Sequence, residues 1–176
     1  MAVLAIRTPE DGLLGALAPL GLAAAAGTAL VVDLDPHGPR YPGEGSLAHL
    51  VADGPRRSDL TPLRTGLAVL RNGGVEPGPA REVVDALAEG WPVVVVRLPA
   101  RDRARADVVV HPLVVGGLFP PSPGAVFQDL GFRVTAPGPV LPPLSRTTAA
   151  ALLAGTVPRR SRWVRAWKAI GEPAWA

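Results

Sequence analysis

Two aspartates stand one residue apart after a short apolar run, in the stretch ALVVDLDPHGP from Ala29 to Pro39. Such runs are typical of buried strands, and Pro36 and Gly38 end this one in a turn. Carboxylates at the C-terminal end of a buried strand lie where open α/β sheets bind their ligands. Asp33 and Asp35 could therefore position magnesium or a water molecule. The alternative is structural, with both carboxylates capping the sheet by accepting hydrogen bonds from loop N–H groups.

Apolar periodicity predicts strands that alternate with helices along the whole chain. The expected strands are 2–6, 29–32, 67–70, 93–98, 106–111 and 132–135. The expected helices are 9–26, 46–52, 79–89, 122–130, 145–153 and 160–170. This order implies an α/β fold, a doubly wound and mostly parallel sheet with helices on both faces in three layers.

The elements suggest a division of the chain into two parts. Residues 1–135 form the expected α/β domain, and residues 136–176 form a Pro-rich linker with two C-terminal helices. We expect the last helix to pack on the same domain, because amphipathic helices usually cover a core.

Composition and charge exclude several kinds of site. The 176 residues contain no cysteine, which rules out disulfides, thiolate metal sites and a cysteine nucleophile. The three scattered histidines do not have the spacing of a zinc site. Residues 156–176 carry five basic groups against one acidic group, whereas the rest is nearly neutral. A general nucleic-acid surface on the body of the protein is therefore not expected.

The stretch from Gly12 to Val32 contains 21 residues without a charge, enough to span a membrane. Gly27 and Thr28 divide it, however, into an Ala/Leu-rich segment typical of a helix and a Val-rich segment typical of a strand. We therefore expect a helix followed by a strand, in a cytoplasmic protein.

The basic tail, PRRSRWVRAWKAIG from Pro158 to Gly171, predicts an amphipathic helix with its apolar residues at i, i+3, i+4 and i+7. Three alternatives follow for this helix. It packs on its own domain or a dimer mate, it lies on an anionic membrane, or it holds a partner protein or nucleic acid. The binding candidates are Arg159, Arg160, Arg162, Trp163, Arg165, Trp167, Lys168 and Ile170.

Several motifs occur in a characteristic order. A strand ends in Asp-Leu-Asp-Pro (Asp33 to Pro36), Gly-Ser-Leu opens a helix (Gly45 to Leu47), and a Leu-Ala-Val-Leu strand (Leu67 to Leu70) precedes a Gly-Gly turn. The later strand VVVVRLP runs from Val93 to Pro99. In this order and spacing, residues 1 to about 115 resemble the ParA/MinD group of deviant P-loop ATPases, with the TadZ/CpaE branch as one candidate.

The chain departs from that family at three points. The family's first strand leads into a glycine-rich loop with Gly-Lys-Thr and an earlier lysine, but the stretch here is RTPEDGLLG, from Arg7 to Gly15. A phosphate cradle needs free backbone N–H groups and a lysine, whereas Glu10 and Asp11 bring negative charge. Arg97 stands where the family usually has an aspartate that helps to organise magnesium.

The resemblance and these departures together imply a pseudo-ATPase without ATP or magnesium as a cofactor and without catalytic residues. Arg7, Asp33, Asp35 and Arg97 are the candidates for a vestigial nucleotide site. We expect Asp33 and Asp35 to act as local caps, and to pair with Arg7 or Arg97.

The function implied by the resemblance is a positioning, regulatory or scaffolding role in a spatial-organisation or pilus/secretion system. The expected partner is a protein, in a homodimer or in a heterodimer with a related ATPase. Peripheral contact with the inner face of the membrane through the C-terminal helix is an added possibility, and nucleic acid is not expected. The alternatives are a nucleotide-binding ATPase switch that uses Asp33, Asp35 and Arg7, or a DNA-associated partition protein.

Overall fold

The computed structural model describes residues 2–10, 12–43, 45–56, 62, 66–115 and 124–175, with side chains as far as Gly171. The strands are β1 (Ala2–Arg7), β2 (Ala29–Asp33), β3 (Leu67–Leu70), β4 (Val93–Arg97), β5 (Val108–Leu113), β6 (Ala125–Asp129) and β7 (Val140–Leu141). The helices are α1 (Leu13–Ala26), α2 (Leu47–Asp53), α3 (Pro77–Gly90), α4 (Arg146–Leu153) and α5 (Arg162–Trp175).

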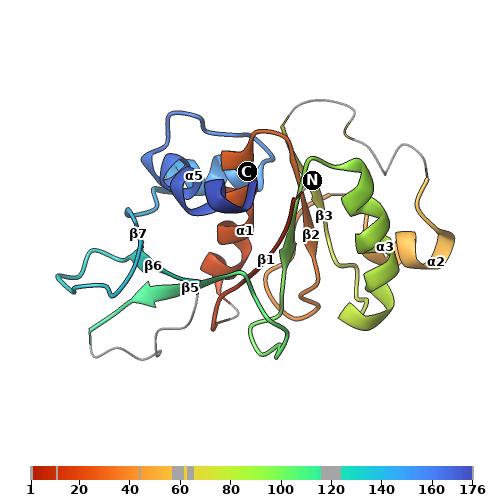
Figure 1. Cartoon of the computed structure of the whole chain (residues 1–176), viewed down its shortest axis with the longest axis horizontal. Coiled ribbons are helices and arrows are strands. Elements are labelled where there is room, and N and C mark those ends of the chain that lie inside the picture. The colour runs from red at the N-terminus through yellow and green to blue at the C-terminus, as the bar shows by residue number, and fades with distance from the viewer. Residues whose placement is uncertain are drawn as a thin grey trace.

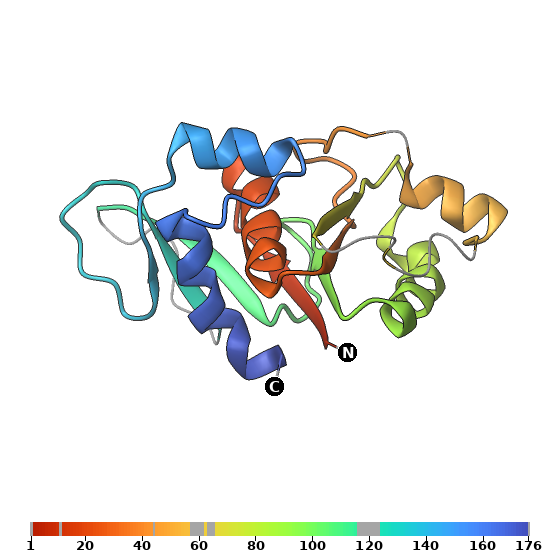
Figure 2. The same ribbon diagram turned by 90° about the horizontal axis from the view of Figure 1, so that it is seen from above.

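Within the described residues, seven strands form one parallel sheet in the order β3-β2-β4-β1-β5-β6-β7. One face is covered by α1, with α4 and α5 beside it, and the other face by α2 and α3 (Figures 1 and 2). Each face has its own buried apolar cluster. The expected doubly wound, three-layer α/β fold is therefore confirmed.

The central strands β2 and β4 are buried at every residue. Continuous Val-rich runs are typical of parallel strands with a helix layer on each side, because neither face then meets water. The helix cap expected at Ser46 is present, because the Ser46 hydroxyl accepts a hydrogen bond from the N–H of His49 at the start of α2.

The first helix differs in detail from the expectation. α1 begins at Leu13, after Gly12, and passes through Pro19 without ending. A proline inside a helix removes one backbone hydrogen bond, so its place here depends on burial against neighbouring elements. In the described part of the chain, no helix combines the length and the hydropathy that crossing a bilayer requires.

Two expected elements between residues 122 and 135 are wrong. The predicted helix 122–130 contains β6, which pairs with β5 and β7. The predicted strand 132–135 is not a strand, and Phe132 is 53% exposed. The sheet gains its last strand instead from Val140–Leu141, inside the expected linker, where Leu141 is fully buried.

Candidate functional site

The register between β2 and β4 brings Asp33 directly beside Arg97 at the carboxyl edge of the sheet. The guanidinium of Arg97 lies between two carboxylates. Its Nη1 is 3.3 Å from Oδ1 of Asp33, and its Nη2 is 2.6 Å from Oδ2 of Asp35. All three side chains are buried. Of the two arginines expected to pair with these aspartates, Arg97 therefore does so.

Further contacts hold the Arg97 guanidinium in place. Its Nη1 donates a hydrogen bond of 2.7 Å to the carbonyl oxygen of Pro39, and its Cζ lies 5.5 Å from the centre of the Tyr41 ring. The Tyr41 hydroxyl donates to the carbonyl oxygen of Ala16 in α1, over 2.7 Å. Burial raises the pKa of Tyr41, so the hydroxyl stays protonated and keeps this bond. The ion pairs are thus tied to both β2 and α1.

The two carboxylates also order the loop that follows β2. Oδ1 of Asp33 accepts the N–H of Asp35 over 3.1 Å. Oδ1 of Asp35 accepts the N–H groups of His37 and Gly38, over 3.1 Å and 3.0 Å. These bonds are the capping interactions expected from the sequence. They divide the two oxygens of Asp35 between different partners, since Oδ1 binds the loop and Oδ2 binds Arg97.

Burial raises the pKa of Asp33 to about 6, although the charge of Arg97 and the N–H of Asp35 act in the opposite direction. A carboxyl group with such a pKa changes its protonation between mildly acidic and neutral pH. Protonation of Asp33 would weaken its pairing with Arg97, because the attraction of opposite charges is then lost.

The segment from Arg7 to Gly15, which stands in the place of the family's phosphate loop, makes hydrogen bonds within itself and to Asp102. Nη1 of Arg7 donates to the carbonyl oxygen of Asp102, away from the two aspartates. The Thr8 hydroxyl donates to the carbonyl oxygen of Glu10 over 2.7 Å, and a side chain at Gly15 would meet that hydroxyl. Glu10 is exposed, and Asp11 lies outside the described residues. The vestigial-site candidates therefore divide, with Asp33, Asp35 and Arg97 together and Arg7 apart.

Among the described residues, two cavities open at the carboxyl edge of the sheet. One, of about 280 Å³, is lined by Asp33, Asp35, Tyr41, His49, Arg71 and Asn72, among others. The other, of about 320 Å³, lies between α1 and the end of β6 and is mostly apolar, with Leu13, Leu14, Leu17 and Leu130 in its wall. A polar and an apolar cavity thus lie where open α/β sheets bind ligands.

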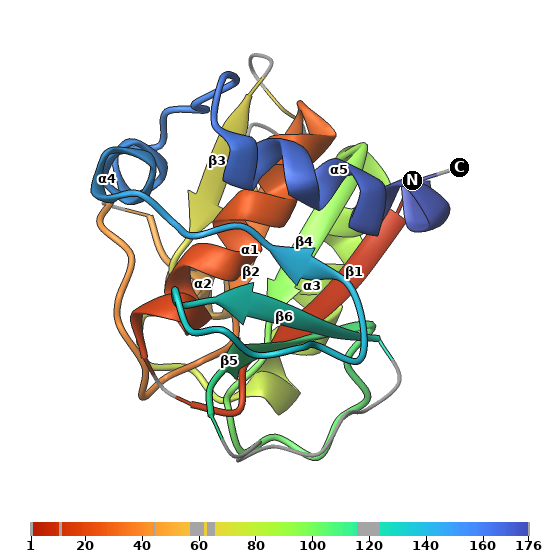
Figure 3. The ribbon, with the colours of Figure 1, turned by 90° about the vertical axis from the view of Figure 1, so that its left-hand side faces the viewer.

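The basic C-terminal helix α5 packs on α1 through its apolar face, and the two helices cross in Figure 3. Trp163 and Trp167 are buried and meet edge to face, with ring centres 5.6 Å apart. The Trp163 indole donates to Oε1 of Gln128 in β6 over 2.6 Å. Gly21 of α1 lies beneath both rings, where a side chain would collide with them. The tryptophans named as binding candidates are therefore occupied by contacts within the chain.

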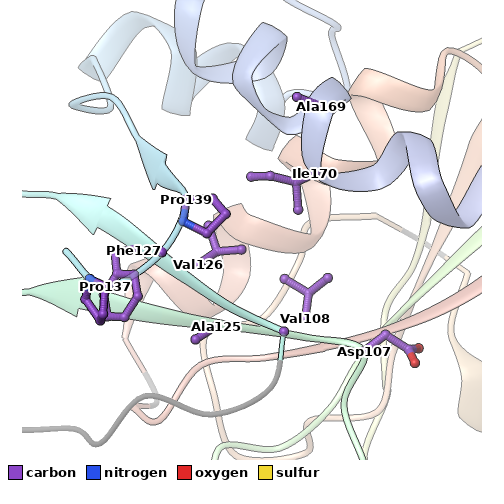
Figure 4. A pocket seen from close by; sticks show the side chains of 11 residues that line it. Asp107, Val108, Ala125, Val126, Phe127, Pro137, Pro139, Ala169 and Ile170 are labelled. Atoms are coloured by element: carbon purple, nitrogen blue, oxygen red, sulfur yellow. The ribbon is translucent and has the colours of Figure 1, made fainter.

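The remaining tail candidates are arranged differently. The five cations of the tail are exposed, namely Arg159, Arg160, Arg162, Arg165 and Lys168. Ile170 is partly buried and lines a cavity of about 520 Å³ between α5, the starts of β5 and β6, and residues 137–139 (Figure 4). The wall of this cavity is mainly apolar, with Val108, Val126 and Phe127 among its residues. The Asp107 carboxylate at its rim accepts the N–H of Ala5 over 2.9 Å.

Asp33, Asp35 and Arg97 together form what we call the aspartate–arginine site. Three residues that support this site were not predicted from the sequence. Gly38 has no side chain, and a Cβ atom there would collide with Arg97 and Asp35. The ring of Tyr41 lies under the guanidinium of Arg97. The amide of Asn72, after β3, donates to the carbonyl oxygens of Asp33 and Val75 over 3.2 Å and 2.9 Å. The one available signal was the chain's single tyrosine, placed six residues after Asp35.

In this conformation the site does not present free carboxylates to a metal ion. A divalent cation beside Asp33 and Asp35 would have to replace the Arg97 guanidinium, which is paired with both. Among the described residues, no group of three or more His, Cys, Asp or Glu side chains is placed to hold a metal.

Comparison with known proteins identifies the fold. No family model matches the sequence, and no curated protein matches it. The septum site-determining protein MinD from Pyrococcus horikoshii OT3, complexed with Mg-ADP, is similar in structure with a TM-score of 0.60 and 14% identity, covering 98% of this chain and 95% of that chain. Cobyrinic acid a,c-diamide synthase from Mycobacterium smegmatis, with bound ADP and magnesium, gives a TM-score of 0.52 and 16% identity, covering 96% and 91%.

The comparison corrects the expectation that ATP and magnesium play no part. Both similar structures hold ADP and magnesium, so proteins with this fold do bind nucleotide and metal, whereas Arg7 to Gly15 of this chain contains no lysine. That expectation rested on the missing glycine-rich loop, on its missing lysine and on Arg97 in the place of an aspartate. With the parallel sheet, its strand order and these two neighbours, the chain has the ParA/MinD-like P-loop NTPase fold.

Proposed function

We propose that this chain is a non-hydrolysing ParA/MinD-like protein that acts as a positioning, regulatory or scaffolding partner in a spatial-organisation or pilus/secretion system. The observation that carries the proposal is the buried guanidinium of Arg97 between Asp33 and Asp35. The Arg97 cation neutralises the two carboxylates, which a hydrolysing site would use to position magnesium or a water molecule.

The chemistry of phosphoryl transfer supports the absence of hydrolysis. Catalysis of this reaction consists almost entirely of positioning and of neutralising charge on the phosphates, by a lysine, by metal ions and by aimed backbone N–H groups. The chain has no lysine before Lys168, which lies on α5. Glu10 stands close to the start of α1 and adds negative charge near the helix N-terminus, where phosphates are bound in such folds.

A protein of this kind that does not hydrolyse ATP would act by binding another protein through its surface. Leu13 and Leu130 flank the apolar cavity at the carboxyl edge and are 58% and 49% exposed. Phe132 lies two positions after Leu130 and is exposed as well. Large apolar side chains gathered at one edge favour contact with another protein, which we propose is a second copy or a related ATPase.

A nucleotide-dependent switch is the second candidate, favoured by the ADP and magnesium in both similar structures. The apolar cavity between α1 and β6 would accept an apolar or planar group, and the first N–H groups of α1 face the same edge. Asp33 and Asp35 would hold the metal in this case, after Arg97 had released them. The metal would supply charge neutralisation for the phosphates, and the chain would act by changing its partner surface.

Hydrolysis and binding are tested separately on the whole chain. Phosphate release from ATP with magnesium should not exceed that of a buffer blank, and Asp35→Asn should leave it unchanged. The matched control is Asp85→Asn, which changes an exposed carboxylate on α3. Turnover that Asp35→Asn abolishes and Asp85→Asn preserves would overturn the proposal.

Calorimetric titration with Mg-ADP, combined with light scattering, addresses the second candidate. Binding that weakens in Asp35→Asn, together with a change in molar mass, would establish the nucleotide switch. A dimer that forms equally with and without Mg-ADP supports the scaffolding role instead.

A further inference from the structure

A small cleft lies at the edge of the sheet opposite to Arg97, beside the end of α1. Its volume is about 260 Å³. Ala24, Ala25 and Val157 form an apolar part of the wall, and Arg159, Arg165 and Lys168 line it with three cations. Gly27, which ends α1, and Gly66, which precedes β3, also border the cleft. Asp33, Asp35 and Arg97 do not line this cleft.

The three cations are exposed and have no acidic partner among the described residues. The ion pairs of Arg97 with Asp33 and Asp35 lie at the opposite edge of the sheet and involve none of these three cations. No acidic side chain lines the cleft. Among the described side chains, no carboxylate therefore neutralises the positive charge around the cleft.

The placement of these cations costs the fold stability. The first turn of α5 contains Arg162 and Arg165 and no acidic residue, although the N-terminal end of a helix favours negative charge. Arg165 and Lys168 are three residues apart on the same helix, and like charges at this spacing repel. The negative end of α1 offsets part of this cost. Local choices that oppose stability are expected mainly at functional sites.

Lys168 is the single lysine in a chain whose basic residues are otherwise all arginine. A compositional preference for arginine accounts for the many exposed arginines of the surface, but not for this exception. An ammonium group and two guanidinium groups around one cleft provide both a compact charge and planar, two-pronged hydrogen-bond donors.

We propose that this cleft binds a phosphate-bearing ligand whose apolar part lies on Ala24, Ala25 and Val157. A phosphate group carries up to two negative charges and several acceptor oxygens, which suits three cations better than a single carboxylate does. The proposal is independent of nucleotide chemistry at the opposite edge of the sheet.

The phosphate could come from a soluble phosphate monoester or from the head group of an anionic lipid. The apolar face of α5 is turned toward α1, with Trp163 and Trp167 buried, so the helix is not free to insert into a bilayer. A lipid would therefore be recognised through its head group at the cleft.

The test uses the whole chain and two charge-matched double variants. Arg165→Gln with Lys168→Gln removes two cations of the cleft, whereas Arg160→Gln with Arg162→Gln removes two cations of the same tail outside it. Calorimetric titration with monomeric dihexanoyl phosphatidic acid and with inorganic pyrophosphate measures the soluble source. Flotation with phosphatidylcholine vesicles, with and without phosphatidic acid, measures the lipid source.

We expect the cleft variant to weaken binding about tenfold or more, and the control variant to weaken it less than about twofold. Equal losses in the two variants would show a diffuse basic surface and overturn the proposal, as would the absence of binding in both assays. Binding in the soluble assay alone assigns a small molecule, and binding to vesicles only when they contain phosphatidic acid, lost in the cleft variant, assigns a lipid.

A second measurement exploits the single lysine. Acetylation by an amine-reactive ester, followed by mass spectrometry, reports Lys168 and the chain's α-amino group in one experiment. Dihexanoyl phosphatidic acid should slow the modification of Lys168 and leave that of the α-amino group unchanged. Equal rates with and without the ligand would contradict occupation of the cleft.

Discussion

Arg97 Nη2 lies 2.6 Å from Asp35 Oδ2, although the two residues are 62 positions apart in the sequence. The pair is buried, and parallel pairing of β2 with β4 brings the two strand ends together. A buried ion pair adds little net stability, but removing one partner leaves an uncompensated charge in a poorly solvated place. The stability of this edge therefore depends on all three members being present.

Replacement of Arg97 tests that dependence. Arg97→Met should lower the free energy of unfolding by about 3–5 kcal/mol at neutral pH, because it leaves the two buried carboxylates without their cation. Urea unfolding followed by circular dichroism gives the value. The control Arg101→Met changes an exposed arginine of the loop after β4 and should stay within about 0.5 kcal/mol.

A triple variant separates charge from packing at the same place. Asp33→Asn and Asp35→Asn combined with Arg97→Met should recover part of the stability lost in Arg97→Met alone, since no buried charge is then unpaired. A triple variant less stable than Arg97→Met would show that the cost comes from lost packing and hydrogen bonds.

Stability should also depend on pH through Asp33. The pKa of this carboxyl is about 6 in the folded chain and has its ordinary value of 3.8 in the unfolded chain. The folded state therefore holds a proton between these values that the unfolded state has lost, and stability falls as pH rises through this window. The fall should amount to about 3 kcal/mol and end above the folded pKa.

The measurement is the difference in unfolding free energy between the native chain and Asp33→Asn, taken by urea unfolding at several pH values from 4 to 7. The variant cannot titrate at this position, so other groups cancel in the difference. A difference that rises with pH would mean that Arg97 outweighs burial and lowers the pKa of Asp33.

Gly38 should be required by the Arg97–Asp35 pair. A side chain at this position would collide with Nη2 of Arg97 and Oδ2 of Asp35, so Gly38→Ala should cost about 1–3 kcal/mol. Gly45→Ala, in open space on the same loop, should change stability by less than about 0.5 kcal/mol. Thermal unfolding compares the two variants, and equal effects would contradict a specific collision.

Gly21 should play the corresponding part under α5. Gly21→Ala would push Trp163 and Trp167 away from α1 and should lower stability by about 1–3 kcal/mol. Gly78→Ala, in the first turn of α3 with open space around it, should raise stability by about 0.4–1 kcal/mol, since alanine loses less entropy in a helix.

Opposite signs for the two helix variants, measured by thermal unfolding, would establish that α5 docks closely on α1. A red shift of tryptophan fluorescence in Gly21→Ala alone would locate the change at the indole rings. No loss of stability in that variant would contradict the close packing.

The aspartate–arginine site shows how far local pattern reaches. The placement of Asp33 and Asp35 after a buried strand is readable from the run that precedes them, and so is their capping of the loop. Arg97 and Arg7 both follow apolar strands, and nothing local distinguishes them. Strand order decides between them, since β4 lies beside β2, whereas Arg7 at the end of β1 turns to Asp102.

The segment 122–135 shows the opposite limit. The short apolar pattern of AVFQD in β6 is compatible with either a helix or a strand. The segment forms a strand because it can pair with the backbone of β5. Val126 and Phe127 are buried on either side of the strand, a gain that a surface helix there would not provide. The FRVT sequence that follows has strand-forming residues but finds no partner strand.

The amino-acid sequence by itself determined the alternation of strands and helices from β1 to β4, the position of the carboxylates and the apolar face of the last helix. These features depend on spacing along the chain, which periodicity and turn residues encode. Only the tertiary structure decided that Arg97 joins Asp33 and Asp35, that Gly21 receives two tryptophans and that three cations of the tail line one cleft. Such groupings follow from which strands and helices become neighbours, because burial and hydrogen bonding between distant segments select them.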